Sequence, residues 1–307
     1  MQTISGKPLS RFSFGTMQFG GKADDAESAA MYAACREAGV NFFDTANGYT
    51  GGQSEQMLGR FAASERDDVF IATKCASDRT ASPEVIEREF DESRRRLGQE
   101  TVDLLYIHQP DPTTPVEVTF GALAKYVRSG AVRNVGISNF SAWASMKARQ
   151  AAREAGIDVT FLQPMYNLVK RQAEVEILPM AVSEEFYVCP YSPLGGGLLT
   201  GKYAAGEGGR LRDDSMYSNR YGPDWMHKAA SDLRSMASDL GVHPATLAVA
   251  WVARHQGVWG PITSARSVEQ LAPSLAAITF DMDDDLYARM SALTPTPPPA
   301  NDRLEEA

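Results

Sequence analysis

The sequence predicts an α/β protein in which eight parallel strands and the helices between them close into a (β/α)8 barrel. Two observations support this fold. Apolar, β-rich runs alternate along the chain with segments of helical periodicity, and a glycine follows each of the clearest helical segments. Such alternation is typical of parallel β/α units. The length of 307 residues fits one barrel, because these domains commonly run to about 250 residues or more.

Eight runs rich in apolar and β-branched residues are the predicted strands. They are residues 12–16, 40–44, 69–74, 102–108, 132–138, 159–163, 186–191 and 258–263. Eight strands favour the closed barrel over an open doubly wound sheet. A short hairpin that turns at Gly6, Lys7 and Pro8 is expected before the first strand.

The clearest predicted helices lie between these strands, at residues 25–38, 83–97, 116–129 and 141–155. Ser82 precedes Pro83, and both residues suit the start of a helix. Ser141 is expected to begin its helix in the same way. The glycines that follow the four helices are expected to adopt the left-handed conformation that ends a helix. They are Gly39, Gly98, Gly130 and Gly156.

The connection before the last predicted strand is long and runs from Ser192 to about Gln256. It contains a stretch rich in glycine and charge, 206–214, and two predicted helices, 225–240 and 244–255. A connection of this length in a compact domain is usually functional or disordered. We expect residues 1–307 to form a single domain, with a flexible tail at 294–307 that is rich in proline and then acidic.

Composition limits the classes of partner. The formal net charge of −9 argues against nucleic acid or an anionic membrane as the main partner. Cys35, Cys75 and Cys189 form no CxxC pair, so neither a disulfide framework nor a metal site is expected. The N-terminus lacks the pattern of a signal peptide, and no apolar run approaches the length of a membrane span. We therefore expect a cytoplasmic protein.

Polar residues stand at the ends of the predicted strands, where barrel enzymes carry their active sites. Asp44, Lys74 and His108 end the second, third and fourth strands, and Tyr49 lies in the loop after Asp44. Each residue alone has an ordinary structural reading, but their coincidence at successive strand ends indicates a site. Reduction of a carbonyl group needs a proton donor for the oxygen while hydride adds to the carbon. A tyrosine can donate that proton, and a nearby ammonium group would lower its pKa.

Longer stretches around these residues resemble the aldo-keto reductase family, whose members are TIM barrels. The stretches that carry the resemblance are residues 44–49, 54–59, 71–74, 103–108 and 130–140. The similarity runs from about Leu9 to Leu275. It implies an oxidoreductase that transfers a hydride from NADPH to an aldehyde or ketone. In this reading Tyr49 is the proton donor, assisted by Lys74, His108 and Asp44.

The resemblance also implies how NADP(H) binds. Ser138, Asn139 and Gln163 would hold the nicotinamide carboxamide, and the ring of Tyr191 would stack on the nicotinamide. Residues 190–202 resemble the family's pyrophosphate loop, where small residues let backbone N–H groups approach phosphate. The expected cofactor contacts are Gly15, Thr16, Met17, Asp44, Ser138, Asn139, Gln163, Tyr191, Ser192, Pro193, Leu194, Gly195, Gly197, Gly201, Lys202, Ser264, Ala265, Arg266, Gln270 and Ser274.

The last predicted strand and the residues after it would bind the adenosine end of the cofactor. Arg266 would meet a 2′-phosphate, which favours NADPH over NADH because a guanidinium group suits phosphate. The sequence departs from the family pattern at two positions here. Ser264 stands where the family commonly has glycine, and Ser274 stands where it usually has an asparagine that contacts adenine.

The expected substrate is a small or medium aldehyde, a sugar or a ring ketone, or the corresponding alcohol. The side chains expected around it are Met17, Phe19, Tyr49 and parts of 109–113 and 216–225. The remaining histidines match no motif and are interpreted as structural. They are His227, His243 and His255. Cys75 should point away from the barrel interior, because side chains alternate along a strand. A monomer or weak homo-oligomer is expected.

Two other functions stay open at this point. Lys74 could form an imine with a carbonyl substrate, as in Schiff-base enzymes. The protein could instead be an NADP-binding regulatory or interaction protein that resembles the potassium-channel β subunits, which are similar to the same family.

Overall fold

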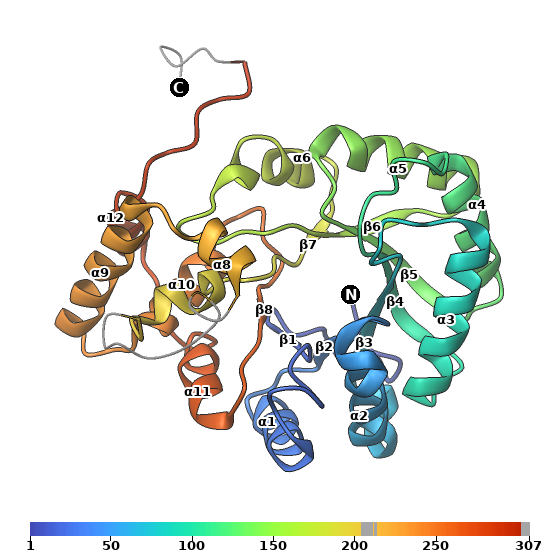
Figure 1. Ribbon diagram of the computed structural model, residues 1–307, viewed down its shortest axis with the longest axis horizontal. Helices are drawn as coiled ribbons and strands as arrows, with labels where there is room; N and C mark the ends of the chain where they lie inside the picture. Colours follow the sequence, from blue (N-terminus) through green and yellow to red (C-terminus); the bar gives the residue numbers. More distant parts are fainter. Residues whose placement is uncertain (204–210, 212–213, 302–307) are drawn as a thin grey trace.

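The computed structural model describes residues 1–203, 211 and 214–301. Within this part of the chain, eight parallel strands pair in the order β7-β6-β5-β4-β3-β2-β1-β8. They are β1 Ser13–Gly15, β2 Phe42–Asp44, β3 Phe70–Cys75, β4 Val102–Ile107, β5 Val132–Ser138, β6 Val159–Gln163, β7 Tyr187–Val188 and β8 Ile262–Thr263. Figure 1 shows the strands in the middle of the molecule with helices around them. Each observed strand lies within, or within one residue of, a predicted run.

The two ends of the sheet come together just beyond β7. Tyr191 and Ile262 form an isolated parallel bridge, and the N–H of Ile262 donates to the carbonyl of Pro190 at 2.9 Å. This arrangement is consistent with a (β/α)8 barrel. Strands β7 and β8 are shorter than predicted, because Pro190 and Pro261 lie inside the predicted runs and have no N–H to donate to a neighbouring strand.

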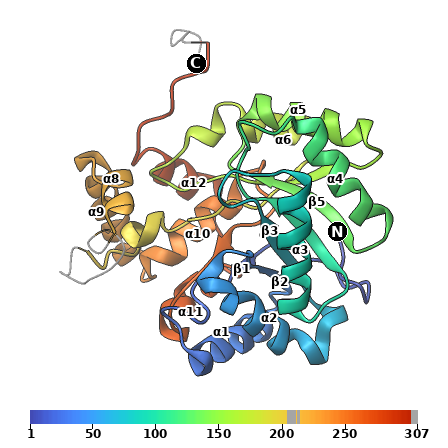
Figure 2. The same ribbon diagram turned by 45° about the vertical axis from the view of Figure 1, so that its right-hand side comes forward.

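Helices cover the outside of the sheet in both views (Figures 1 and 2). The α-helices are α1 Asp25–Glu37, α2 Gln53–Ala62, α3 Pro83–Leu97, α4 Val116–Arg128, α5 Ala142–Glu154, α6 Ile177–Ser183, α8 Ser215–Arg220, α9 Asp224–Asp239, α10 Pro244–Arg254, α11 Val268–Ala276 and α12 Asp284–Ser291. Four 3-10 helices accompany them in the described chain: η1 Tyr49–Gly52, η2 Ala63–Asp68, η3 Gln172–Glu174 and η4 Gly195–Thr200. The six predicted helices agree with α1, α3, α4, α5, α9 and α10 to within one residue at each end.

The helix ends follow the expected chemistry. The hydroxyl of Ser82 accepts from the N–H of Val85 at 3.4 Å, and that of Ser141 accepts from Ala144 at 3.2 Å. The four glycines that follow the predicted helices all have positive φ, for example +63° at Gly98. In the described part of the chain, five further α-helices outside the clearest predicted ones, α2, α6, α8, α11 and α12, are short, at 6 to 10 residues each.

Two apolar clusters lie on the two sides of the strands. The larger cluster joins the outer faces of the strands to the helices and includes Cys75, as the alternation of side chains predicts. The smaller one fills the inside of the sheet and consists of Leu9, Phe42, Phe70, Ala72, Leu104, Tyr106, Phe161, Cys189 and Ile262. Because side chains alternate along a strand, a residue two positions after one of these inner residues also points to the inner face of the sheet. Asp44 thus follows Phe42, and Lys74 follows Ala72.

The ends of the chain and the long connection are described in part. Gln2 and Pro8 form an isolated antiparallel bridge, so the chain turns back before β1 without forming strands. Of the stretch 206–214, only Leu211 and Asp214 are described. Residues 295–301 carry no helix or strand, and 302–307 lie outside the described residues. No helix in the described part of the chain has the length and apolar character needed to span a membrane.

Candidate active site

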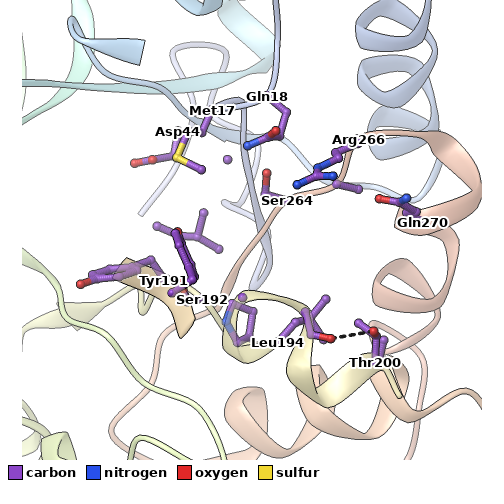
Figure 3. Close-up of a pocket in the computed structure, with 18 of the residues that line it drawn as sticks. Met17, Gln18, Asp44, Tyr191, Ser192, Leu194, Thr200, Ser264, Arg266 and Gln270 are labelled. Carbon is purple, nitrogen blue, oxygen red and sulfur yellow. Dashed lines mark hydrogen bonds between the residues drawn. The ribbon is translucent and has the colours of Figure 1, made fainter. Parts of the chain in front are cut away.

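A cleft of about 870 Å³ opens at the carboxyl ends of the strands, above the inner apolar cluster. Figure 3 shows Tyr191, Ser192 and Leu194 along one wall, facing Met17 and Gln18 across the space. At one end of the same view are the Arg266 and Gln270 side chains. Tyr49 and His108 also line the cleft. The site therefore extends from the centre of the barrel mouth to α11.

The base of the cleft holds a buried ion pair. Lys74 Nζ contacts Asp44 Oδ1, and both side chains are almost completely buried, at 0% and 3% exposed. The same Nζ donates to the carbonyl oxygen of Thr45 at 2.7 Å and to the hydroxyl of Tyr49 at 3.3 Å. Lys74 thus joins the end of β3 to the end of β2 and to the loop that carries Tyr49.

A hydrogen-bond network connects this pair to the predicted nicotinamide contacts. Gln163 Nε2 donates to Asp44 Oδ2 at 2.9 Å, and the Ser138 hydroxyl donates to the carbonyl of Gln163 at 2.9 Å. Asn139 Nδ2 lies 3.0 Å from Ser138 Oγ, and the hydroxyl of Tyr191 donates to Asn139 Oδ1 at 2.8 Å. The structure brings these residues together on neighbouring strand ends, which fixes their orientation toward the cleft.

Burial decides how the groups of the site ionise. Burial raises the pKa of Tyr49 and outweighs the opposing charge of Lys74. Lys74 lowers the pKa of Tyr49 as expected, but burial has the larger effect, so the pKa is raised overall. The phenol consequently keeps its proton at neutral pH, as a proton donor requires.

His108 stands beside Tyr49, with ring centroids 5.9 Å apart and planes at 79°. Burial, together with the nearby charge of Lys74, lowers the pKa of His108 to about 3. The imidazole is thus neutral at pH 7. Its Nδ1 atom is buried and has no hydrogen-bond partner within the described residues.

Most of the residues predicted from the sequence to bind the cofactor do line the cleft. They are Gly15, Met17, Asp44, Ser138, Asn139, Gln163, Tyr191, Ser192, Pro193, Leu194, Gly197, Gly201, Lys202, Ser264, Ala265, Arg266 and Gln270. Thr16, Gly195 and Ser274 do not line it. Thr16 is buried beneath the cleft, where its hydroxyl bonds to Ser54 at 2.8 Å, and Ser274 is only 1% exposed.

The predicted substrate-side residues line the cleft in part, and Phe19 is the one that needs correction. Met17 and Gln109 line the cleft, but Phe19 is fully buried and packs against Phe14 in the outer core. In the segment 216–225, Met216 and Trp225 are 52% and 41% exposed and do not line the cleft. Tyr217 lines it instead, because the adjacent side chains of α8 point in different directions.

Sequence reasoning also missed several lining residues. They are Gln18, Arg234, Pro244, Ala245 and Pro273, whereas Gly196 and Thr200 belong to the predicted pyrophosphate loop, and Ile262 and Glu269 to the predicted adenosine segment. His243 was interpreted as only structural, yet it lines the cleft while its Nδ1 accepts from the N–H of Ala245 at 3.0 Å. Arg234 and His243 belong to α9 and the start of α10, and no local pattern indicates that these helices approach the cleft.

The described residues offer no candidate metal centre. Among them, no group of three or more His, Cys, Asp or Glu side chains is placed to hold a metal ion. Cys35, Cys75 and Cys189 are free and buried.

Comparison with known proteins identifies the family. The model of the aldo/keto reductase family matches residues 11–295. The chain belongs to the aldo/keto reductase family. This membership supports an oxidoreductase, in agreement with the resemblance seen in the sequence.

Individual relatives carry different names. A rice protein (Oryza sativa subsp. japonica) named a probable voltage-gated potassium channel subunit beta is 34% identical over 294 residues, covering 89% of each chain. Aflatoxin B1 aldehyde reductase member 2 of Rattus norvegicus is 33% identical, covering 90% of this chain and 82% of its own. L-glyceraldehyde 3-phosphate reductase of Escherichia coli O157:H7 is 30% identical, covering 91% and 88%.

Proposed function

We propose that the protein is a single-domain (β/α)8 barrel that works as an NADP-dependent aldo-keto reductase. It would transfer a hydride from NADPH to the carbonyl carbon of an aldehyde or ketone. The observation that carries this proposal is the position of Tyr49. Its hydroxyl lies 3.3 Å from Lys74 Nζ, and the residue lines the cleft together with His108. Relatives named as aldehyde reductases agree with this chemistry.

The residues of the site divide the work of reduction. Bound NADPH supplies the hydride. Tyr49 donates the proton to the carbonyl oxygen, and Lys74 stabilises the phenolate that remains. Asp44 keeps Lys74 charged in its buried position. His108 is neutral and lines the cleft, and we expect it to bond to the same oxygen.

The cleft fits a dinucleotide. Gly196 and Gly197 have φ of +66° and +98°, and an added Cβ would come within 2.7 Å of the Tyr217 ring or 3.0 Å of Lys202. Only glycine leaves this backbone open to phosphate. Thr200 Oγ1 bonds to the carbonyl of Gly197 at 2.8 Å and closes this turn (Figure 3). Tyr49 and Gln270 line the same cleft, which supports an extended cofactor.

Arg266 supports a preference for NADPH. It lines the far end of the cleft and forms no ion pair with another described residue, so its guanidinium can receive a 2′-phosphate. We expect NADPH to quench tryptophan fluorescence with micromolar or tighter affinity, and Arg266→Ala to weaken NADPH binding without weakening NADH binding. Arg95→Ala, on the exposed face of α3, is the matched control. Equal affinity for both nucleotides in the wild-type protein would refute the NADPH preference.

A regulatory function remains the second candidate, because two plant relatives are named as potassium channel β subunits. A panel of aldehydes and ketones separates the two. Rapid oxidation of NADPH with some of them supports the reductase. Slow turnover with every compound, very slow cofactor release and a stable protein partner would support the regulatory function. A Schiff-base mechanism is disfavoured, because Lys74 is buried and its Nζ is engaged by Asp44, Thr45 and Tyr49.

A further inference from the structure

The loop that carries Tyr49 has an unusual backbone. Thr50, Gly51 and Gly52 follow Tyr49 with φ of +49°, +64° and +92°. The two glycines adopt this left-handed region readily, but Thr50 has a Cβ and is strained there. Such a backbone persists only where the surrounding structure holds it in place. The position of the Tyr49 hydroxyl therefore depends on contacts outside the loop.

The Thr50 hydroxyl donates to the carbonyl of Phe19 at 2.8 Å, and helix α3 supplies a second contact through Arg96. Its Nη1 donates to the carbonyl oxygen of Asn47 at 2.9 Å, two residues before Tyr49, and its Nη2 pairs with Glu92 at 2.6 Å. The N–H of Asn47 bonds to the carbonyl of Lys74 at 3.0 Å. The backbone of Asn47 thus connects Arg96 on one side to Lys74 on the other. At Gly52 any Cβ would overlap the guanidinium group, so Arg96 packs directly against both ends of the loop.

Glu55 anchors Arg96 from the opposite side. Helices α2 and α3 lie side by side (Figures 1 and 2), and Glu55 on α2 is 0% exposed. Its Oε2 lies 3.4 Å from Arg96 Nη1, and its Oε1 accepts from the hydroxyl of Thr73 at 2.6 Å. Thr73 immediately precedes Lys74 on β3. A buried carboxylate must be paired and hydrogen bonded, and Arg96 and Thr73 meet this need.

We propose that Arg96 is a positioning residue, which with Glu55 sets the distance between the Tyr49 hydroxyl and Lys74. Arg96 contacts neither residue itself and acts through the carbonyl of Asn47 and the backbone at Gly52. The planar fork of the guanidinium serves three acceptors on three segments, which a lysine cannot do. This inference rests on the proposed role of Tyr49 as the proton donor.

The test compares Arg96→Met with the wild-type protein. A displacement of about 1 Å at a reacting group can cost on the order of 100-fold in rate, so we expect kcat for reduction to fall about 10- to 100-fold. KM for the aldehyde and Kd for NADPH should change little. The alkaline limb of the kcat profile should move to higher pH, because Lys74 lowers the pKa of Tyr49 less when the two groups separate. Arg96→Lys should recover part of the rate.

Arg95→Met is the matched control, since Arg95 is the exposed neighbour on the same helix. A simple loss of folded protein would lower the rate without moving the pH profile. If Arg96→Met does not fold, Thr73→Val removes one anchor of Glu55 and should produce the same shift in a smaller degree. An unchanged kcat and pH profile in Arg96→Lys and Thr73→Val would overturn the proposal.

A crystal structure of the Arg96→Lys variant tests the proposed role of Arg96 without measuring enzyme activity. We expect the distance from Tyr49 Oη to Lys74 Nζ to exceed the 3.3 Å of the wild-type protein. An unchanged distance would contradict the proposed role of Arg96. Absence of NADPH oxidation by the wild-type protein with every carbonyl compound would instead refute the proposed function, so the two failures are distinguishable.

Discussion

The hydroxyl of Tyr49 lies 3.3 Å from Lys74 Nζ, although Tyr49 begins η1 in the loop after β2 and Lys74 lies on β3. The ammonium group also lies over the Tyr49 ring, 4.9 Å from its centroid. Burial raises the pKa of Tyr49, and the charge of Lys74 is the largest of the effects that lower it. Burial and this contact therefore act in opposite directions on the pKa of the phenol, and burial is the larger effect.

Replacement of Lys74 by methionine tests the effect of this contact. Without the ammonium group the pKa of Tyr49 should rise further, because burial is then unopposed. The phenol is the form that donates, so the alkaline limb of reduction should move to higher pH. The rate at pH 7 should fall by about 10²- to 10⁴-fold, the range typical of general acid catalysis. Steady-state kcat between pH 6 and pH 11 measures this, and unchanged NADPH affinity confirms that the variant is folded. A profile identical to that of the wild-type protein would contradict the assignment.

His108 gives a prediction about stability in acid. Its pKa is about 3 in the folded protein and about 6.5 when unfolded, so the unfolded chain binds more protons between these values. Stability should therefore fall as the pH decreases from about 6.5 toward 3. His108→Asn should reduce the loss between pH 7 and pH 5 by on the order of 1–2 kcal/mol in urea unfolding. The same loss in both proteins would show that the imidazole is not held neutral.

The neutral state of His108 also bears on catalysis. A group that stays neutral above about pH 3 adds no titration to kcat/KM in the neutral range. We therefore expect the pH profile of kcat/KM to show no inflection near pH 6.5 that is due to His108. The profiles of the wild-type protein and of His108→Asn should be the same in this range.

Gly136 tests the packing of the barrel interior below the site. A Cβ at this position on β5 would come within 2.5 Å of the Tyr106 ring and 3.0 Å of Phe161. Gly136→Ala should therefore destabilise the protein by about 1–3 kcal/mol, the usual cost of overpacking. Gly121→Ala on α4 is the matched control, since its added Cβ meets no atom within 4 Å. This control should be stabilised by about 0.5–1 kcal/mol. Equal melting temperatures for the two variants would contradict the packing described.

The centre of the site is predictable from the sequence because Asp44, Lys74 and His108 lie at strand ends and Tyr49 lies in the loop after the first of them. Period-two alternation assigns Asp44 and Lys74 to the inner face, and the order of strands makes them neighbours. Gln163 is predictable for the same reason. The motifs around these residues are also specific, so the family and the eight strands follow from the sequence together.

The outer parts of the cleft are not predictable in this way. Arg234 and His243 reach it from α9 and α10, and their position depends on how these helices pack rather than on a local pattern. Phe19 is close in sequence to the cleft residue Met17, yet its side chain is buried in the core and does not reach the cleft. The contact of Arg96 with Asn47 spans 49 residues, and only the packing of α3 reveals it.

The most direct test of the proposed function is the oxidation of NADPH, followed at 340 nm, by wild-type protein and Tyr49→Phe in the presence of an aldehyde. We predict that the wild-type protein oxidises NADPH only when the aldehyde is present, and that Tyr49→Phe lowers kcat by about 10²- to 10⁴-fold with unchanged NADPH affinity. Full activity of Tyr49→Phe would show that another group donates the proton and would contradict the account of this site.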